Sequence, residues 1–168
     1  MGSSTFKGAT IKNTRSSAVN LIETVAREPA DFAFVTRSQP GLADVDELVE
    51  RVRRTGLPVE LVVEGARVPV PVGIDLSAYR IVQEALTNTL KHASATSAGV
   101  AVRYEPGEVT VEVVDDGAGG AVEANGGHGL IGMRERVALY GGVLRAGGRP
   151  HGGFAVSASF PLDDAGDV

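Results

Sequence analysis

The chain has 168 residues, 43% of them hydrophobic, with a formal net charge of −5 and no cysteine. This length supports one domain with a sizeable core and an additional arm, and the hydrophobic content argues against disorder throughout. No apolar run reaches the roughly 18 residues that a membrane-spanning helix needs. Disulfide and thiolate chemistry are excluded, and the acidic balance gives no basic surface for nucleic acid.

The first 40 residues are expected to form an arm of uncertain origin ahead of the main domain. Residues 1–13 are polar and begin Met-Gly-Ser-Ser, which is typical of an expression remnant and not of a secretory signal. A short helix is predicted over residues 16–27 and a short strand over residues 31–36. The turn signal Ser-Gln-Pro-Gly at 38–41 marks a boundary. A domain over residues 41–162 and a polar tail over 163–168 follow.

Helical and strand patterns alternate along this domain. Asp44 or Asp46 caps a first helix, which Gly56 ends, and a second helix begins at Asp75 and fades after Ala93. The remaining expected elements are strands over 57–63, 97–104, 108–114, 143–146 and 154–160 and a helix over 130–140. Strands in one sheet with helices on one face predict an α/β (α+β) two-layer sandwich, whose sheet is mixed and largely antiparallel.

One face of the second helix carries a row of polar side chains. Glu84, Asn88 and Lys91 or His92 follow one another at i, i+4 and i+7 or i+8, which places them on one side. The apolar residues that face the core are expected to be Val82, Ala85, Leu86 and Leu90. An amide oxygen suits Mg²⁺, a carboxylate can orient water or accept a proton, and a lysine can contact phosphate. Taken alone, the row is better explained as a solvated stripe.

Two glycine-containing segments carry further candidate chemistry. Asp115 closes an apolar strand before Asp116-Gly117-Ala118-Gly119, and its carboxylate could accept a hydrogen bond from an exocyclic amine. By itself this segment is a plain Asp-Gly turn. Later, Gly127-His128-Gly129-Leu130 leads into a helix expected to start near Ile131, whose free N–H groups favour phosphate. The small residues over 117–127 predict a mobile lid or simply a flexible loop.

The three segments occur in a fixed order within about fifty residues: QEALTN at 83–88, DDGAG at 115–119 and GHGLIGM at 127–133. Together they resemble the N, G1 and G2 boxes of the GHKL (Bergerat-fold) ATPases. QEALTNTLKHA with GHGLIGMRERV resembles the sensor histidine kinases of the nitrate/nitrite-sensor type. Gly152-Gly153-Phe154 resembles the glycine-rich turn before their last strand. The resemblance implies a Bergerat ATP-binding fold over residues 41–162, with ATP and Mg²⁺ as cofactors.

The resemblance also implies a role for each matching residue. Glu84 is the catalytic base or water-orienting acid, Asn88 binds Mg²⁺, and Asp115 binds the adenine amine. The other nucleotide-binding positions comprise a pair near the phosphates, the glycines of the adenine pocket, and the phosphate-side segment with its hinge glycines. They are Lys91 and His92; Gly117 and Gly119; and Gly127, His128, Gly129, Leu130 and Gly132.

The family carries its phosphoacceptor histidine on an upstream helical hairpin, and none of His92, His128 and His151 fits that position. The chain is therefore expected to be an isolated catalytic domain that does not autophosphorylate alone and is monomeric. Its partners would be a histidine-bearing dimerisation domain of the same kinase and a response regulator, without nucleic acid or membrane contact. A cytoplasmic location is expected, compatible with membrane anchoring of the full kinase. The alternatives are a nucleotide-binding module without kinase activity and an anti-sigma-type protein serine kinase.

Overall fold

A computed structural model describes residues 39–118 and 128–162 of the chain. The chain divides into two units after Gln39, and the second, Pro40–Val168, contains every helix and strand reported below. The helix predicted over residues 16–27, the strand over 31–36 and the tail over 163–168 lie outside the described residues. The predicted division into an arm, a domain and a tail stays a prediction.

Five strands form one sheet in the order β1-β2-β3-β5-β4. The strands are β1 Val59–Glu64, β2 Ala98–Glu105, β3 Glu108–Asp115, β4 Val143–Gly148 and β5 Phe154–Pro161. Parallel pairing joins β1 to β2, with Val59 opposite Ala98, whereas every other neighbouring pair is antiparallel. The sheet is therefore mixed and largely antiparallel, as predicted.

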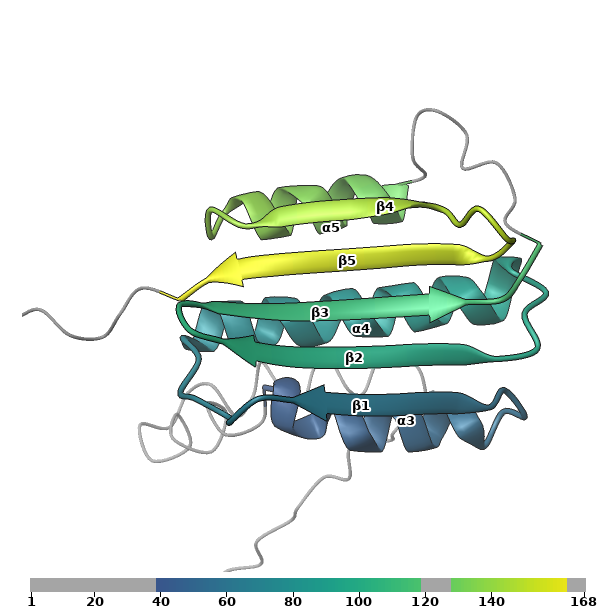
Figure 1. The fold of residues 1–168 in the computed structure, drawn as a ribbon, viewed down its shortest axis with the longest axis horizontal. Coiled ribbons are helices and arrows are strands. Elements are labelled where there is room, and N and C mark those ends of the chain that lie inside the picture. Colours follow the sequence, from purple (N-terminus) through teal and green to yellow (C-terminus); the bar gives the residue numbers. More distant parts are fainter. Residues whose placement is uncertain (1–38, 119–127, 163–168) are drawn as a thin grey trace, which may run out of the picture. The chain divides into compact units, whose positions relative to one another are not determined.

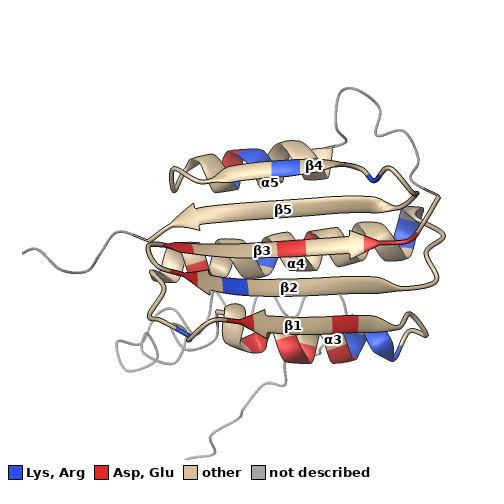
Figure 2. Cartoon of the chain, viewed as in Figure 1, with Lys and Arg blue, Asp and Glu red and all other residues tan. Residues whose placement is uncertain are grey.

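The helices cover one face of this sheet (Figure 1), which completes the predicted two-layer sandwich. They are the 3₁₀ turn η1 Leu42–Asp44 and the α-helices α3 Val45–Arg53, α4 Val72–His92 and α5 His128–Ala138. In α3 the acidic residues Asp46 and Glu47 occupy the first turn and the basic residues Arg51 and Arg53 the last, which suits the helix dipole (Figure 2).

The core lies between the two layers because alternate strand residues face the helices. Along β3, Val109, Val111, Val113 and Asp115 are buried, while the residues between them are partly exposed. Phe160 of β5 is the largest fully buried side chain among the described residues. On the opposite face of the sheet, Arg103 of β2 pairs with Glu64 of β1 and Glu112 of β3 at 2.8 and 2.9 Å. These ion pairs tie three strands together at their exposed side.

Two helix starts and one core assignment differ from prediction. Helix α4 begins at Val72, three residues before Asp75, because the Asp75 amide donates to the Pro71 carbonyl oxygen and closes the first turn. The Asp75 carboxylate does not cap the helix but accepts a hydrogen bond from the Leu42 amide. Helix α5 begins at His128 and ends at Ala138, so it starts before Ile131. Leu90 is 45% exposed and was wrongly placed in the core. It lies about 80° around the helix from Val82, at the edge of the apolar stripe.

Candidate functional site

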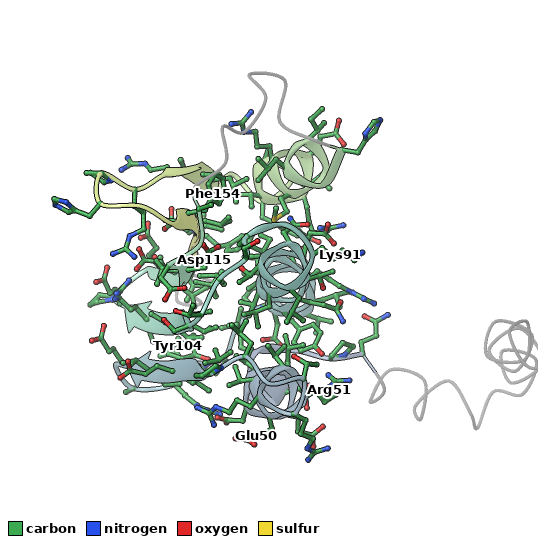
Figure 3. All side chains as sticks on the ribbon, turned by 90° about the vertical axis from the view of Figure 1, so that its right-hand side faces the viewer. Glu50, Arg51, Lys91, Tyr104, Asp115 and Phe154 are labelled. Carbon is green, nitrogen blue, oxygen red and sulfur yellow. The ribbon has the colours of Figure 1, made fainter. Side chains whose placement is uncertain are left out.

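Asp115 ends strand β3 with its carboxylate turned toward α4 (Figure 3). The residue is 6% exposed, and both carboxylate oxygens accept hydrogen bonds. The Gly117 and Phe154 amides donate to Oδ1 at 2.9 and 3.3 Å, and the Thr89 hydroxyl lies 3.2 Å from Oδ2. Three separate segments of the chain therefore hold one buried carboxylate at the end of the sheet.

The turn after β3 packs tightly against the end of α4. A Cβ atom on Gly117 would lie 2.1 Å from the Ala93 carbonyl oxygen, so only glycine fits this approach, and the Ala118 amide donates to the same oxygen. Close packing on Ala93 thus accounts for glycine at position 117. The predicted role of Gly117 in an adenine pocket stays a prediction.

Asp116 has a structural role that the motif did not reveal. Its exposed carboxylate accepts hydrogen bonds from the backbone amides and side-chain hydroxyls of Thr96 and Ser97, the two residues before β2. These donors, with the Thr96 hydroxyl contributing most, hold the pKa of the Asp116 carboxyl well below its usual range. The two adjacent aspartates therefore differ in function: Asp115 faces the helix layer and Asp116 anchors a loop.

The polar row on α4 faces the first turn of α5. Glu84 and Asn88 are half-buried, and Lys91 is exposed on the side of α4 away from the sheet (Figure 3). A Cβ atom on Gly129 would lie 2.8 Å from Glu84 Oε1 and 3.7 Å from Asn88 Nδ2. The missing side chain at position 129 therefore lets the α5 backbone approach both predicted functional groups.

The start of α5 supplies the rest of the described site. His128 is its first residue and is exposed, and the next residue, Gly129, lies beside Glu84 and Asn88. Leu130 is 8% exposed and packs in the core. Gly132 has open space where a side chain would project. Gly129 and Gly132 therefore lie within α5, and their predicted role as hinge glycines stays a prediction.

Other predicted site residues lie wholly or partly outside the described part of the chain. Gly119 and Gly127 lie outside the described residues, as does most of the predicted lid over 117–127. His92 is the last residue of α4, and its side chain is likewise outside the described part. A shallow hollow of about 190 Å³ between Asp116 and the turn of residues 149–152 includes neither Glu84 nor Asn88.

Thr89 is a site residue that the sequence reasoning missed. It is 5% exposed and contacts Asp115, although the two lie 26 residues apart in the chain. A signal was present, because Thr89 lies only about 20° around the helix from Val82, so a polar residue occupies the centre of the apolar stripe. A hydroxyl at such a core position needs a buried partner.

No helix in residues 39–118 and 128–162 combines the length and apolar character needed to cross a bilayer. Within the same ranges, no group of three or more His, Cys, Asp or Glu side chains is placed to hold a metal ion.

Residues 73–164 match the family model described as histidine kinase-, DNA gyrase B- and HSP90-like ATPase. The chain is 32% identical over 152 residues to the sensor histidine kinase LnrJ of Bacillus subtilis (strain 168), which covers 86% of this chain and 38% of that protein. It is 34% identical over 110 residues to the signal transduction histidine-protein kinase/phosphatase DegS of Brevibacillus brevis, covering 64% of this chain and 28% of that protein. The chain spans about a third of the length of these relatives.

A solved structure of a histidine kinase domain supports the same family. The histidine kinase domain of the blue-light activated histidine kinase from Erythrobacter litoralis EL346 superimposes with a TM-score of 0.57 at 27% identity, covering 71% of this chain and 64% of that one. Since the family model covers more than half of the sequence, the chain belongs to the histidine kinase-, DNA gyrase B- and HSP90-like ATPase family. Within it, the chain is an ATP-binding catalytic domain of the sensor histidine kinase class. The resemblance to the GHKL ATPases is confirmed.

Proposed function

We propose that residues 41–162 bind ATP with Mg²⁺ and transfer its γ-phosphoryl group to a histidine elsewhere in a longer kinase. The observation that carries this proposal is the arrangement around the end of α4. The buried carboxylate of Asp115 faces one side of the helix, and Glu84 and Asn88 face the start of α5 on another. Membership of the ATPase family supports ATP as the ligand of this arrangement.

Asp115 would recognise the adenine base. An ionised carboxylate is an acceptor only, so it favours a ring that presents an amine over one that presents a carbonyl oxygen. Two backbone amides and one hydroxyl already fix the carboxylate, so little reorganisation is needed when the base binds. Gly117, and Gly119 by resemblance, would border the base.

The row on α4 would serve the phosphates. Mg²⁺ commonly takes one or two protein ligands and fills its other positions with water and phosphate oxygens, which fits the single amide oxygen of Asn88. Asn88 would hold the ion, which would supply positive charge to offset the negative charge of the phosphates. Glu84 would orient the attacking imidazole or accept its proton. Lys91 and His92, and the N–H groups of the first turn of α5, would contact phosphate.

The proposed partners of this domain follow from the chemistry of the proposed reaction. The acceptor histidine would lie on a dimerisation domain of the same kinase, and a response regulator would take the phosphoryl group from it. The named relatives are sensor kinases, which supports this assignment. We propose that the domain is cytoplasmic and that it is monomeric in isolation.

Calorimetric titration of the chain with a non-hydrolysable ATP analogue, with and without Mg²⁺, tests binding. Asp115→Asn should abolish most of the affinity, whereas Glu112→Gln on the same strand removes the same charge from the open face of the sheet and should not. Asn88→Ala should remove the enhancement by Mg²⁺, whereas Gln83→Ala on the same helix should keep it. Absence of binding by the unaltered chain would refute the proposal.

Transfer to a separately supplied helical hairpin bearing a histidine tests catalysis. Glu84→Gln should abolish labelling of the hairpin by radioactive ATP while sparing nucleotide affinity. If Glu84→Gln lowers affinity and transfer equally, its role as a base is wrong. Binding without transfer by the unaltered chain would favour a nucleotide-binding module, and labelling of serine would favour an anti-sigma-type kinase.

A further inference from the structure

The hydroxyl of Thr89 has two possible hydrogen-bond acceptors inside the core. Its Oγ1 lies 3.1 Å from the Ala85 carbonyl oxygen, one turn earlier in α4, and 3.2 Å from Asp115 Oδ2. A hydroxyl has one proton and two lone pairs, so Thr89 can donate to only one of the two at a time. When the Thr89 hydroxyl does not donate to Asp115, its proton can therefore still bond the Ala85 carbonyl oxygen.

The two oxygens of Asp115 are not equivalent. Oδ1 accepts from the Gly117 and Phe154 amides, which use both of its lone-pair directions. Oδ2 has Thr89 as its only donor among the described residues, which leave one of its lone pairs without a donor. A ligand that donates to Asp115 therefore meets Oδ2, beside the Thr89 hydroxyl.

We propose that Thr89 is a positioning residue that sets the specificity of this site for a purine bearing a 6-amino group. Thr89 holds Oδ2 of Asp115 in the orientation that accepts the amine, and it acts through Asp115 and not on the reacting phosphate. This inference rests on the proposed binding of ATP and adds the residue that tunes base recognition. A valine at position 89 keeps the shape and burial of the side chain but removes the one donor to Oδ2 that the described residues provide.

A pair of ligands that differ only in the amine separates this role from a structural one. The probes are the non-hydrolysable analogues of ATP and of purine riboside triphosphate, which lacks the 6-amino group. Calorimetry gives the affinity of each for the unaltered chain, Thr89→Val, Thr89→Ser and Thr87→Val. Thr87 provides the matched control, because it lies on the same helix and its hydroxyl bonds the Gln83 carbonyl oxygen at 2.7 Å.

Thr89→Val should weaken binding of the ATP analogue about ten- to a hundredfold, the usual range for one hydrogen bond to a charged group. It should weaken binding of the purine riboside analogue much less. Thr89→Ser keeps the hydroxyl and should restore most of the preference, and Thr87→Val should leave it unchanged. Equal weakening of both analogues by Thr89→Val, or no weakening of either, would overturn the role of Thr89 while ATP binding stands. Failure of the unaltered chain to bind the ATP analogue would overturn the proposed function and this inference together.

Discussion

Gly129→Ala tests whether Glu84 is held against the first turn of α5. Alanine normally stabilises a helix relative to glycine by about 1 kcal/mol. At position 129 the new Cβ atom would lie 2.8 Å from Glu84 Oε1, so the carboxylate must move by several tenths of an ångström. Moving a side chain off its preferred rotamer costs about 0.5–1.5 kcal/mol, so the two effects nearly cancel.

The neighbouring Gly132 supplies the comparison, because nothing lies within 4 Å of its Cβ position in the same helix. Urea unfolding should therefore show that Gly132→Ala raises the free energy of unfolding by about 1 kcal/mol and that Gly129→Ala leaves it nearly unchanged. In a Glu84→Ala background the obstacle is gone, and Gly129→Ala should become stabilising. If Gly129→Ala stabilises the chain equally with and without Glu84, the two residues are not in contact and the reasoning fails.

The same substitution should lower function for a separate reason. If Glu84 assists the attacking imidazole, displacing its carboxylate should lower phosphoryl transfer to a histidine-bearing hairpin about 10- to 100-fold, since misplacement by about 1 Å can cost that much. The affinity for the ATP analogue should change little. Unchanged transfer would mean that Glu84 keeps its position or has no catalytic role.

Two further substitutions test the turns around Asp115. Gly153→Ala should lower the free energy of unfolding by about 2 kcal/mol or more, because Gly153 has φ of +88° and a Cβ atom there would lie 1.9 Å from the Asp115 carbonyl oxygen. A Cβ atom on Gly147 in the same hairpin would have no neighbour within 4 Å, so Gly147→Ala should lower the free energy of unfolding less. An equal decrease in both variants would contradict this account. Asp116→Asn should lower the free energy of unfolding at neutral pH. It should also make that free energy fall less as the pH is lowered into the acid range. The pKa of Asp116 is lowered from the ordinary value of 3.8 by donors that include Thr96, so its contribution is complete above that value and is lost as the pH falls below it. If the thermal-unfolding midpoints of the unaltered chain and Asp116→Asn fall equally as the pH is lowered, this account is wrong.

Local sequence determined most of the elements of the domain and the residues of the candidate site. The helical row of Glu84 and Asn88, the alternating valines of β3 and the glycine-rich segments all depend on residues a few positions apart, which periodicity reveals directly. The order of the three motifs at 83–88, 115–119 and 127–133 then indicated the family, and this needed no knowledge of tertiary contacts. The strands and helices were placed to within a few residues, and the largest errors were at the starts of α4 and α5.

Only the tertiary structure decided which groups meet across the site. The contact of Asp115 with Thr89 spans 26 residues and that with Phe154 spans 39, and neither follows from a local pattern. Both depend on how the strands are ordered and on which face of α4 is buried against the end of β3. The approach of Gly129 to Glu84 likewise depends on the packing of two helices. Local periodicity assigns each residue to a face of its own element, but long-range packing determines which faces are brought together.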